Sequence, residues 1–159
     1  MTIMLACDTA VALLFYSLFK PVSRNLSMLA AIFRLTLVAI MVVDSMNYFG
    51  VLNLFDAAHS STAFNTGDQI SLVPFGVHCL LIGYLIFWSS FLPRILGALM
   101  TFAGLGWLAF LSPTLTNHLY PYILAPGILV EGALTLWLIV VGLNEQRWKE
   151  QAELSGRVA

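Results

Sequence analysis

The chain has 159 residues, of which 60% are hydrophobic and 9% are charged, and its mean hydropathy is +0.90. This composition excludes an ordinary soluble domain, because the apolar runs are longer than a core helix and approach the thickness of a bilayer. The net charge is -1 and the 7 basic residues form no stripe, so we expect no nucleic-acid partner.

Apolar runs along the chain predict helices that each approach the ~20 residues needed to cross the hydrocarbon layer. Pro21 stops the first of them, Asn25 can cap the second, and Pro93 opens the fourth. The predicted helices cover residues 1–19, 26–52, 73–91, 94–111 and 122–143. The sequence therefore predicts an all-α, polytopic transmembrane bundle over residues 1–143, with five membrane-spanning helices.

Basic residues indicate the orientation of this bundle, because cytoplasmic ends of membrane spans retain Lys and Arg. The polar segments 52–71 and 112–121 carry no cation and are predicted to be loops on the opposite side. Cations at the predicted cytoplasmic ends are Lys20, Arg24, Arg94, Arg147, Lys149 and Arg157. We expect a multi-pass protein with its N-terminus outside, its C-terminus inside, and a mixed-charge helical tail over residues 144–159 in the cytoplasm.

Four ionisable residues fall well inside the predicted spans. At the helical rise, Asp8 and Glu131 lie roughly 18 Å from the cytoplasmic ends of their helices, His78 roughly 20 Å and Arg34 roughly 12 Å. The long side chain of Arg34 can extend upward, so we expect an intramembrane polar layer of Asp8, Arg34, His78 and Glu131. Another polar group belongs to the outer boundary of the second helix, namely Asp44, Asn47 and Tyr48.

Three interpretations of this layer remain open. It can be an ion-pair clamp that holds the helices together, since a guanidinium matches a carboxylate. It can also be a functional pocket in which Asp8 or Glu131 exchanges protons with His78 or binds a polar ligand. A metal or haem site is the third, but adjacent His78 and Cys79 would project about 100° apart on a helix and chelate poorly. We therefore expect no metal site and no cofactor.

Catalytic motifs are missing from the sequence. It contains no hydrolase elbow, phosphate-binding loop, HExxH helix or paired metal-binding cysteines, so we assign no catalytic residue and the sequence favours a non-enzymatic role. Small residues on the fourth helix (Gly97, Thr101, Gly104) and on the fifth (Gly127, Thr135, Gly142) suit close helix packing in a bilayer.

Several stretches of the sequence carry a family resemblance. Residues 75–86, 91–97 and 103–107 are the clearest of them and read FGVHCLLIGYLI, FLPRILG and AGLGW. Further blocks are residues 20–24 (KPVSR), 33–35 (FRL) and 136–138 (LWL), with Pro126 and Glu131. Together these blocks resemble a family of bacterial multi-pass membrane proteins known as domain of unknown function 4386. The resemblance implies a helical bundle in a bacterial inner membrane and no activity, substrate or cofactor. Members of this family usually have another helix before the one that begins here at Met1, so the resemblance implies either that this chain lost that helix or that its assigned start is too late.

Two functions follow as hypotheses. The first is an accessory or interaction subunit of a larger inner-membrane complex, with membrane lipids and other membrane protein subunits as partners. The alternative is a small-molecule or proton-handling bundle that uses the layer of Asp8, Arg34, His78 and Glu131.

Overall fold

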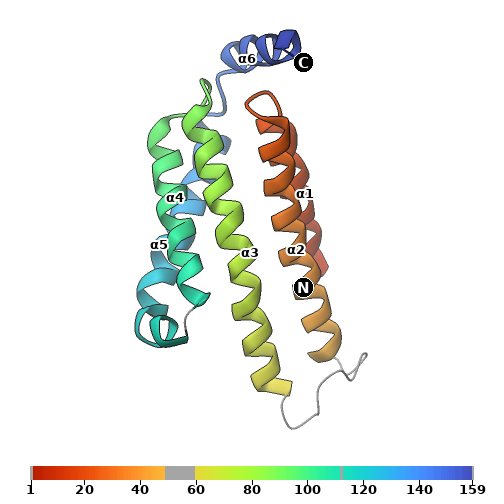
Figure 1. Ribbon diagram of the computed structural model, residues 1–159, viewed down its shortest axis with the longest axis vertical. Coiled ribbons are helices and arrows are strands. Elements are labelled where there is room, and N and C mark those ends of the chain that lie inside the picture. Colours follow the sequence, from red (N-terminus) through yellow and green to blue (C-terminus); the bar gives the residue numbers. More distant parts are fainter. Residues whose placement is uncertain (1, 49–59, 112, 159) are drawn as a thin grey trace.

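The computed structural model describes residues 2–48, 60–111 and 113–158, and every regular element in these ranges is helical. Long helices run side by side, and a short helix lies across one end (Figure 1). The elements are α1 (Thr2–Phe19), α2 (Arg24–Tyr48), α3 (Ser60–Trp88), α4 (Arg94–Leu108), the 3₁₀ turn η2 (Ala109–Leu111), α5 (Pro113–Val140) and α6 (Glu145–Val158). The predicted all-α class is confirmed.

Helix bounds agree with the sequence-based prediction at α1 and at the start of α4 and differ elsewhere, while residues 49–52 of the predicted second helix lie outside the described residues. Residues 60–71 and 113–121, which we predicted to be loops, belong to α3 and α5, and this part of the prediction is wrong. At 1.5 Å per residue, the 29 residues of α3 extend about 43 Å, more than the ~30 Å of a hydrocarbon core. A helix can continue past an apolar layer because its backbone hydrogen bonds need no apolar side chains. The polar composition of residues 60–71 and 113–121 is compatible with a solvent-exposed helix and does not require an irregular loop.

A helix must be both long enough and apolar enough to cross a membrane. In the described part of the chain, one helix meets both, Arg24–Met46, with a mean hydropathy of 2.4. A second membrane span is obtained only if Ala125–Val140 and Glu145–Gly156 are counted as one span, although the angle between these two helices is 102°. Three further helices are apolar but shorter, at Ile3–Phe19, Leu72–Trp88 and Arg94–Leu108.

Glycines let α3 and α4 approach each other at backbone distance. A Cβ atom built on Gly97 would lie 2.8 Å from the carbonyl oxygen of Gly83, and one on Gly83 would lie 2.8 Å from that of Gly97. A second reciprocal pair follows further along, where a Cβ on Gly104 would lie 2.9 Å from the carbonyl oxygen of Gly76. The two antiparallel helices therefore touch along a seam made of two glycine pairs, the arrangement that small residues permit between membrane helices.

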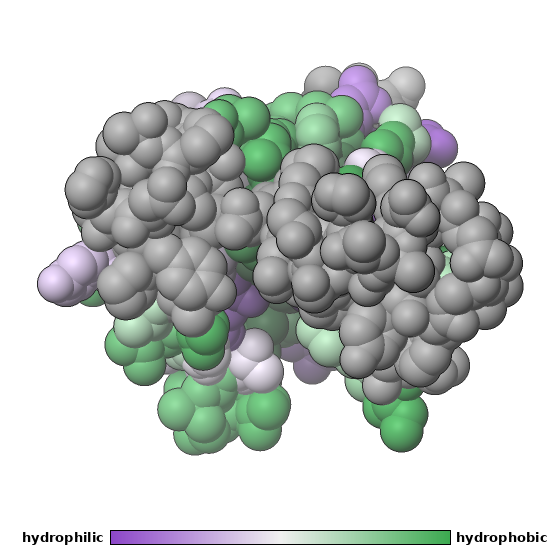
Figure 2. Space-filling view, turned by 90° about the horizontal axis from the view of Figure 1, so that it is seen from below, coloured by the Kyte–Doolittle hydropathy of each residue, from purple (hydrophilic) through white to green (hydrophobic). Residues whose placement is uncertain are grey.

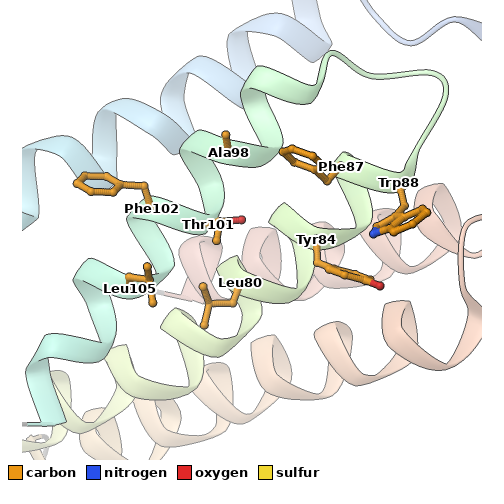
Figure 3. Close-up of a pocket in the computed structure, with 8 residues that line it drawn as sticks. All are labelled: Leu80, Tyr84, Phe87, Trp88, Ala98, Thr101, Phe102 and Leu105. Carbon is orange, nitrogen blue, oxygen red and sulfur yellow. The ribbon is translucent and has the colours of Figure 1, made fainter.

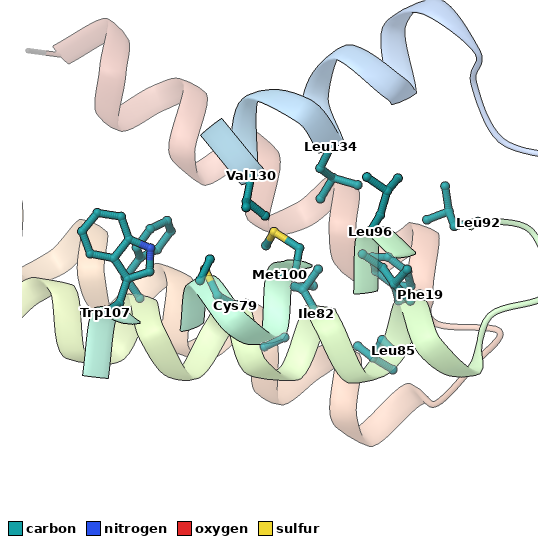
Figure 4. Packing of buried hydrophobic residues seen from close by; sticks show 14 of the residues in the cluster. Phe19, Cys79, Ile82, Leu85, Leu92, Leu96, Met100, Trp107, Val130 and Leu134 are labelled. Carbon is teal, nitrogen blue, oxygen red and sulfur yellow. The ribbon is translucent and has the colours of Figure 1, made fainter. Parts of the chain in front are cut away.

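The apolar core lies between the helices α1 to α5 and includes Ala30 and Leu37 of α2. Figure 4 shows Phe19, Ile82, Leu85 and Leu134 with other members of this cluster gathered between the helices. Phe19, Leu85 and Cys79 are fully buried, so the thiol of Cys79 behaves as a small apolar group. Burial is one-sided, because the opposite faces of the same helices carry large exposed apolar side chains.

The C-terminal helix α6 lies across the end of the bundle that holds the α1–α2 and α3–α4 connections (Figure 1). The chain turns at Gly142, whose φ of 73° is a left-handed conformation that glycine adopts without strain. Trp148 Nε1 donates to the Leu18 carbonyl at 2.9 Å, and the side-chain oxygen of Gln151 accepts from the Ser90 backbone N–H at 3.1 Å. On its outer face, a hydrogen bond from Lys149 holds the pKa of Glu145 below its ordinary value. Residues 144–158 are thus docked against the bundle.

Candidate functional site

An ion pair joins α1 to α2 midway along the bundle. Arg34 donates from Nη2 to Asp8 Oδ1 at 2.5 Å, and the two side chains are 13% and 15% exposed. Asp8 lies in the middle of α1 and Arg34 near the middle of α2, so apolar turns flank both on either side. Charges at such low exposure need a partner, because removing an ion from water costs on the order of several kcal/mol.

Phe75 of α3 is the centre of the site. The guanidinium carbon of Arg34 lies 5.0 Å from the centroid of the Phe75 ring, within cation–π range. The same ring lies 6.1 Å from the imidazole of His78 and 5.7 Å from the indole of Trp107, measured between centroids. An aromatic side chain therefore links the ion pair to polar groups of α3 and α4.

His78 is fully buried and stacks with two aromatic side chains. Its ring is nearly parallel to the rings of Phe15 and Phe75, at interplanar angles of 20° and 13°. His78 Nδ1 lies 2.8 Å from the carbonyl oxygen of Ala30. A carbonyl can only accept, so Nδ1 donates the proton and a neutral ring leaves a lone pair on Nε2. That Nε2 is buried and has no hydrogen-bond partner within the described residues.

Glu131 of α5 completes the layer. It is partly buried, and it is near enough to the Trp107 indole, to Arg34 and to Asp8 for each of them to act on its charge. Gly127, one turn earlier on α5, lies against the Trp107 indole, where a Cβ atom would overlap the ring. This close approach brings the Glu131 carboxyl within reach of the indole N–H.

The structure thus brings Asp8, Arg34, His78 and Glu131 into one layer supplied by α1, α2, α3 and α5. The outer-boundary group lies apart: Asp44 is half-buried nearer the far end of α2, and the side chains of Asn47 and Tyr48 lie outside the described residues. Chemically, the layer combines a guanidinium, two carboxyl groups and an imidazole, which can hold or exchange protons while the whole stays close to neutral.

Metal binding has little geometric support. Among the residues the structure describes, no three His, Cys, Asp or Glu side chains gather as a metal ion would require. Cys7 is exposed on α1, whereas Cys79 is buried in the core, so the two thiols that share a predicted depth do not meet.

Sequence reasoning missed Phe75 and Trp107. Both are apolar or weakly polar types that look like ordinary core residues. A signal was available for Phe75, because it precedes His78 by three positions and must share its face of the helix. No such signal existed for Trp107, whose contact with Glu131 joins two different helices.

Large apolar side chains are exposed on each of the helices α1 to α5. Seen from below, apolar residues show at several places around the rim, and hydrophilic residues show both near the middle and at parts of the rim (Figure 2). On the outer side of the α3–α4 seam lies a groove of about 680 Å³ (Figure 3). Its walls are almost entirely apolar, with Leu80, Trp88 and Phe102 among them and the Thr101 hydroxyl as a rare polar group. Its lining offers a ligand little to recognise beyond shape.

Fold and site together define a class: an all-helical protein with uncovered apolar faces, an internal charged layer and at least one helix able to cross a membrane. Within that class, the chain belongs to the family described as a domain of unknown function (DUF4386), which it matches over residues 1–142. The expected family resemblance is confirmed.

One relative is an uncharacterized protein of Archaeoglobus fulgidus, 34% identical over 101 residues. The match covers 64% of this chain and 56% of the relative, so the chain spans little more than half the length of that protein. No solved structure matches the chain.

Proposed function

We propose that this chain is an integral membrane protein that crosses a bacterial inner membrane with α1 to α5, with its N-terminus outside and its C-terminus in the cytoplasm. Within this arrangement, α6 lies on the cytoplasmic surface. The α1–α2 connection, the α3–α4 connection and α6 share one end of the bundle, and that end holds Lys20, Arg24, Arg94, Arg147 and Lys149. Clustered cations are the mark of a cytoplasmic face.

Uncovered apolar surface supports this placement. Only 22% of the most apolar window of α2 is buried, although that window is the longest apolar stretch described. A core helix of a soluble protein would be mostly buried. Ile3 and Phe102, on α1 and α4, are 81% and 68% exposed, so these faces need lipid or another protein around them.

The role that we propose is that of an accessory subunit, which acts by packing against a membrane partner. The observation that carries it is the surface of α5: this helix packs mainly against α4 and presents Leu129, Leu136 and Ile139, each more than 60% exposed. Gly132 lies on this uncovered surface, and a Cβ atom there would meet nothing within 4 Å. Another helix can therefore approach the α5 backbone closely at this position.

Site-specific photo-cross-linking tests the proposal. A photoreactive residue at Leu129 or Ile139, introduced into the full chain in its native membrane, should give a discrete adduct with another membrane protein. The matched control is Leu134, on the same helix but 3% exposed, which should give none. Adducts with lipid alone, or only with a second copy of this chain, would contradict the accessory role.

A second function is favoured by the unsatisfied groups of the layer. His78 Nε2 and Arg34 Nε are both buried without a hydrogen-bond partner within the described residues. Buried polar atoms of this kind are uncommon and are often completed by water or a ligand. The layer would then bind a small polar molecule or pass protons, with His78 and Glu131 as the exchanging groups.

Purified protein in liposomes that contain a pH-sensitive dye distinguishes the two functions. Under the accessory role, His78→Ala lowers thermal stability and the proton permeability of the liposomes stays at the level of empty ones, with or without the substitution. A proton flux in the wild type that Glu131→Gln abolishes, while the variant remains folded, would establish the second function instead.

A further inference from the structure

A cavity of about 640 Å³ lies at the cationic end of the bundle, between the α1–α2 connection and α6. Its walls are formed by Tyr16 and Ser17 of α1, by Lys20, Ser23 and Arg24 around the turn, and by Trp148 of α6. It is separate from the polar layer, which lies midway along the same helices. The hydrogen bond from Trp148 to Leu18 fixes the α6 wall against α1.

The charges around this cavity are unbalanced. Lys20 and Arg24 are exposed, and their side chains make no ion pair or hydrogen bond within the described residues. The acidic residues of α6, Glu145, Glu150 and Glu153, are not among the side chains that line the cavity, and Glu145 pairs with Lys149. Two cations and the hydroxyls of Ser17 and Ser23 thus converge on space large enough for a phosphodiester headgroup.

The apolar part of the wall continues toward the hydrocarbon region. Tyr16 and Ser17 line the cavity, and Leu13, one helical turn before them on α1, is 57% exposed. A molecule with its charge at Lys20 and Arg24 would therefore have an apolar path along α1 for acyl chains. Trp148 supplies the α6 wall, and tryptophan is enriched at the level of lipid headgroups.

We propose that this cavity binds an anionic phospholipid of the cytoplasmic leaflet, with its phosphate between Lys20 and Arg24 and its acyl chains along α1. The assignment rests on the proposed orientation, which puts this end of the bundle at the cytoplasmic surface. Basic pockets at that depth recognise anionic headgroups, since each nearby cation strengthens binding several-fold. By bridging the turn and α6, the lipid holds α6 on the bundle.

Native mass spectrometry of the full chain, released from a neutral detergent, tests the assignment. Supplied with phosphatidylglycerol and phosphatidylcholine of identical acyl chains, the wild type should retain phosphatidylglycerol selectively. Lys20→Gln with Arg24→Gln should weaken that retention about fivefold for each cation, or about 25-fold for both. The control is Arg94→Gln with Lys149→Gln, which removes one Arg and one Lys from the same end outside the cavity and should change retention less than about twofold.

If the double variant and its control lost phosphatidylglycerol retention equally, the binding would come from diffuse surface charge, and the assignment of the cavity as the binding site would be wrong. Displacement of the lipid by inorganic phosphate at a comparable concentration would also overturn the lipid assignment, because the site would then take free phosphate. The orientation is tested separately with a cysteine probe at Asn65 in a Cys7→Ala background. Labelling from the cytoplasmic side alone would refute the proposed topology. The retention measured in detergent does not depend on the topology and would still test whether the cavity binds the lipid.

Discussion

Replacing Arg34 with Leu should destabilise the bundle by about 3–5 kcal/mol, the range seen when one member of a buried ion pair is removed. The substitution leaves Asp8, at 15% exposure, without its partner, and it takes the cation from the face of Phe75. Thermal or denaturant unfolding of the purified protein in a mild detergent measures the loss.

Two further variants separate the lost ion pair from the loss of a large side chain. Asp8→Asn combined with Arg34→Leu should recover part of the stability, because no uncompensated carboxylate remains. Arg94→Leu, at an exposed position, should change the unfolding free energy by no more than about 0.5 kcal/mol. An Arg34→Leu protein that unfolds like the wild type would mean that Asp8 and Arg34 are each adequately solvated without the other.

Alanine at Gly97 should destabilise the protein by about 1–3 kcal/mol, the usual cost of overpacking a close contact. Its methyl group would lie 2.8 Å from the carbonyl oxygen of Gly83 and 3.0 Å from the backbone nitrogen of Phe87, so α3 and α4 must separate. Backbone atoms cannot rotate aside as a side chain can. The expected loss is net of the gain in helix propensity, which favours Ala over Gly by about 1 kcal/mol.

Gly132→Ala is the matched control for this seam. It introduces the same methyl group into α5, where nothing lies within 4 Å, and should leave stability unchanged or raise it by up to about 1 kcal/mol. Unfolding curves of the Gly97→Ala and Gly132→Ala variants in the same detergent give the difference in unfolding free energy that is caused by close packing at Gly97. Equal stability of the two would show that α3 and α4 do not meet at backbone distance.

The sequence by itself determined the features that follow from helical rise, helix breaking and hydrophobicity. Pro21 and Pro93 end or begin helices wherever they pack, so the ends of α1 and α4 were predictable. The depths of Asp8, Arg34 and His78 follow from counting residues along each helix, which is why a polar layer could be predicted. Family membership was also readable, since it depends on local stretches of sequence.

Tertiary structure decided everything that depends on the rotation of one helix against another. Asp8 rather than Glu131 receives the hydrogen bond of Arg34, and Phe75 joins the ion pair to His78, because of how the side chains of four helices converge. The polar composition of residues 60–71 and 113–121 could not show that α3 and α5 extend beyond the apolar region, because the backbone hydrogen bonds of a helix form with polar and apolar side chains alike. The placement of α6 across the bundle depends on Gly142 and on long-range contacts of Trp148, which no local pattern encodes.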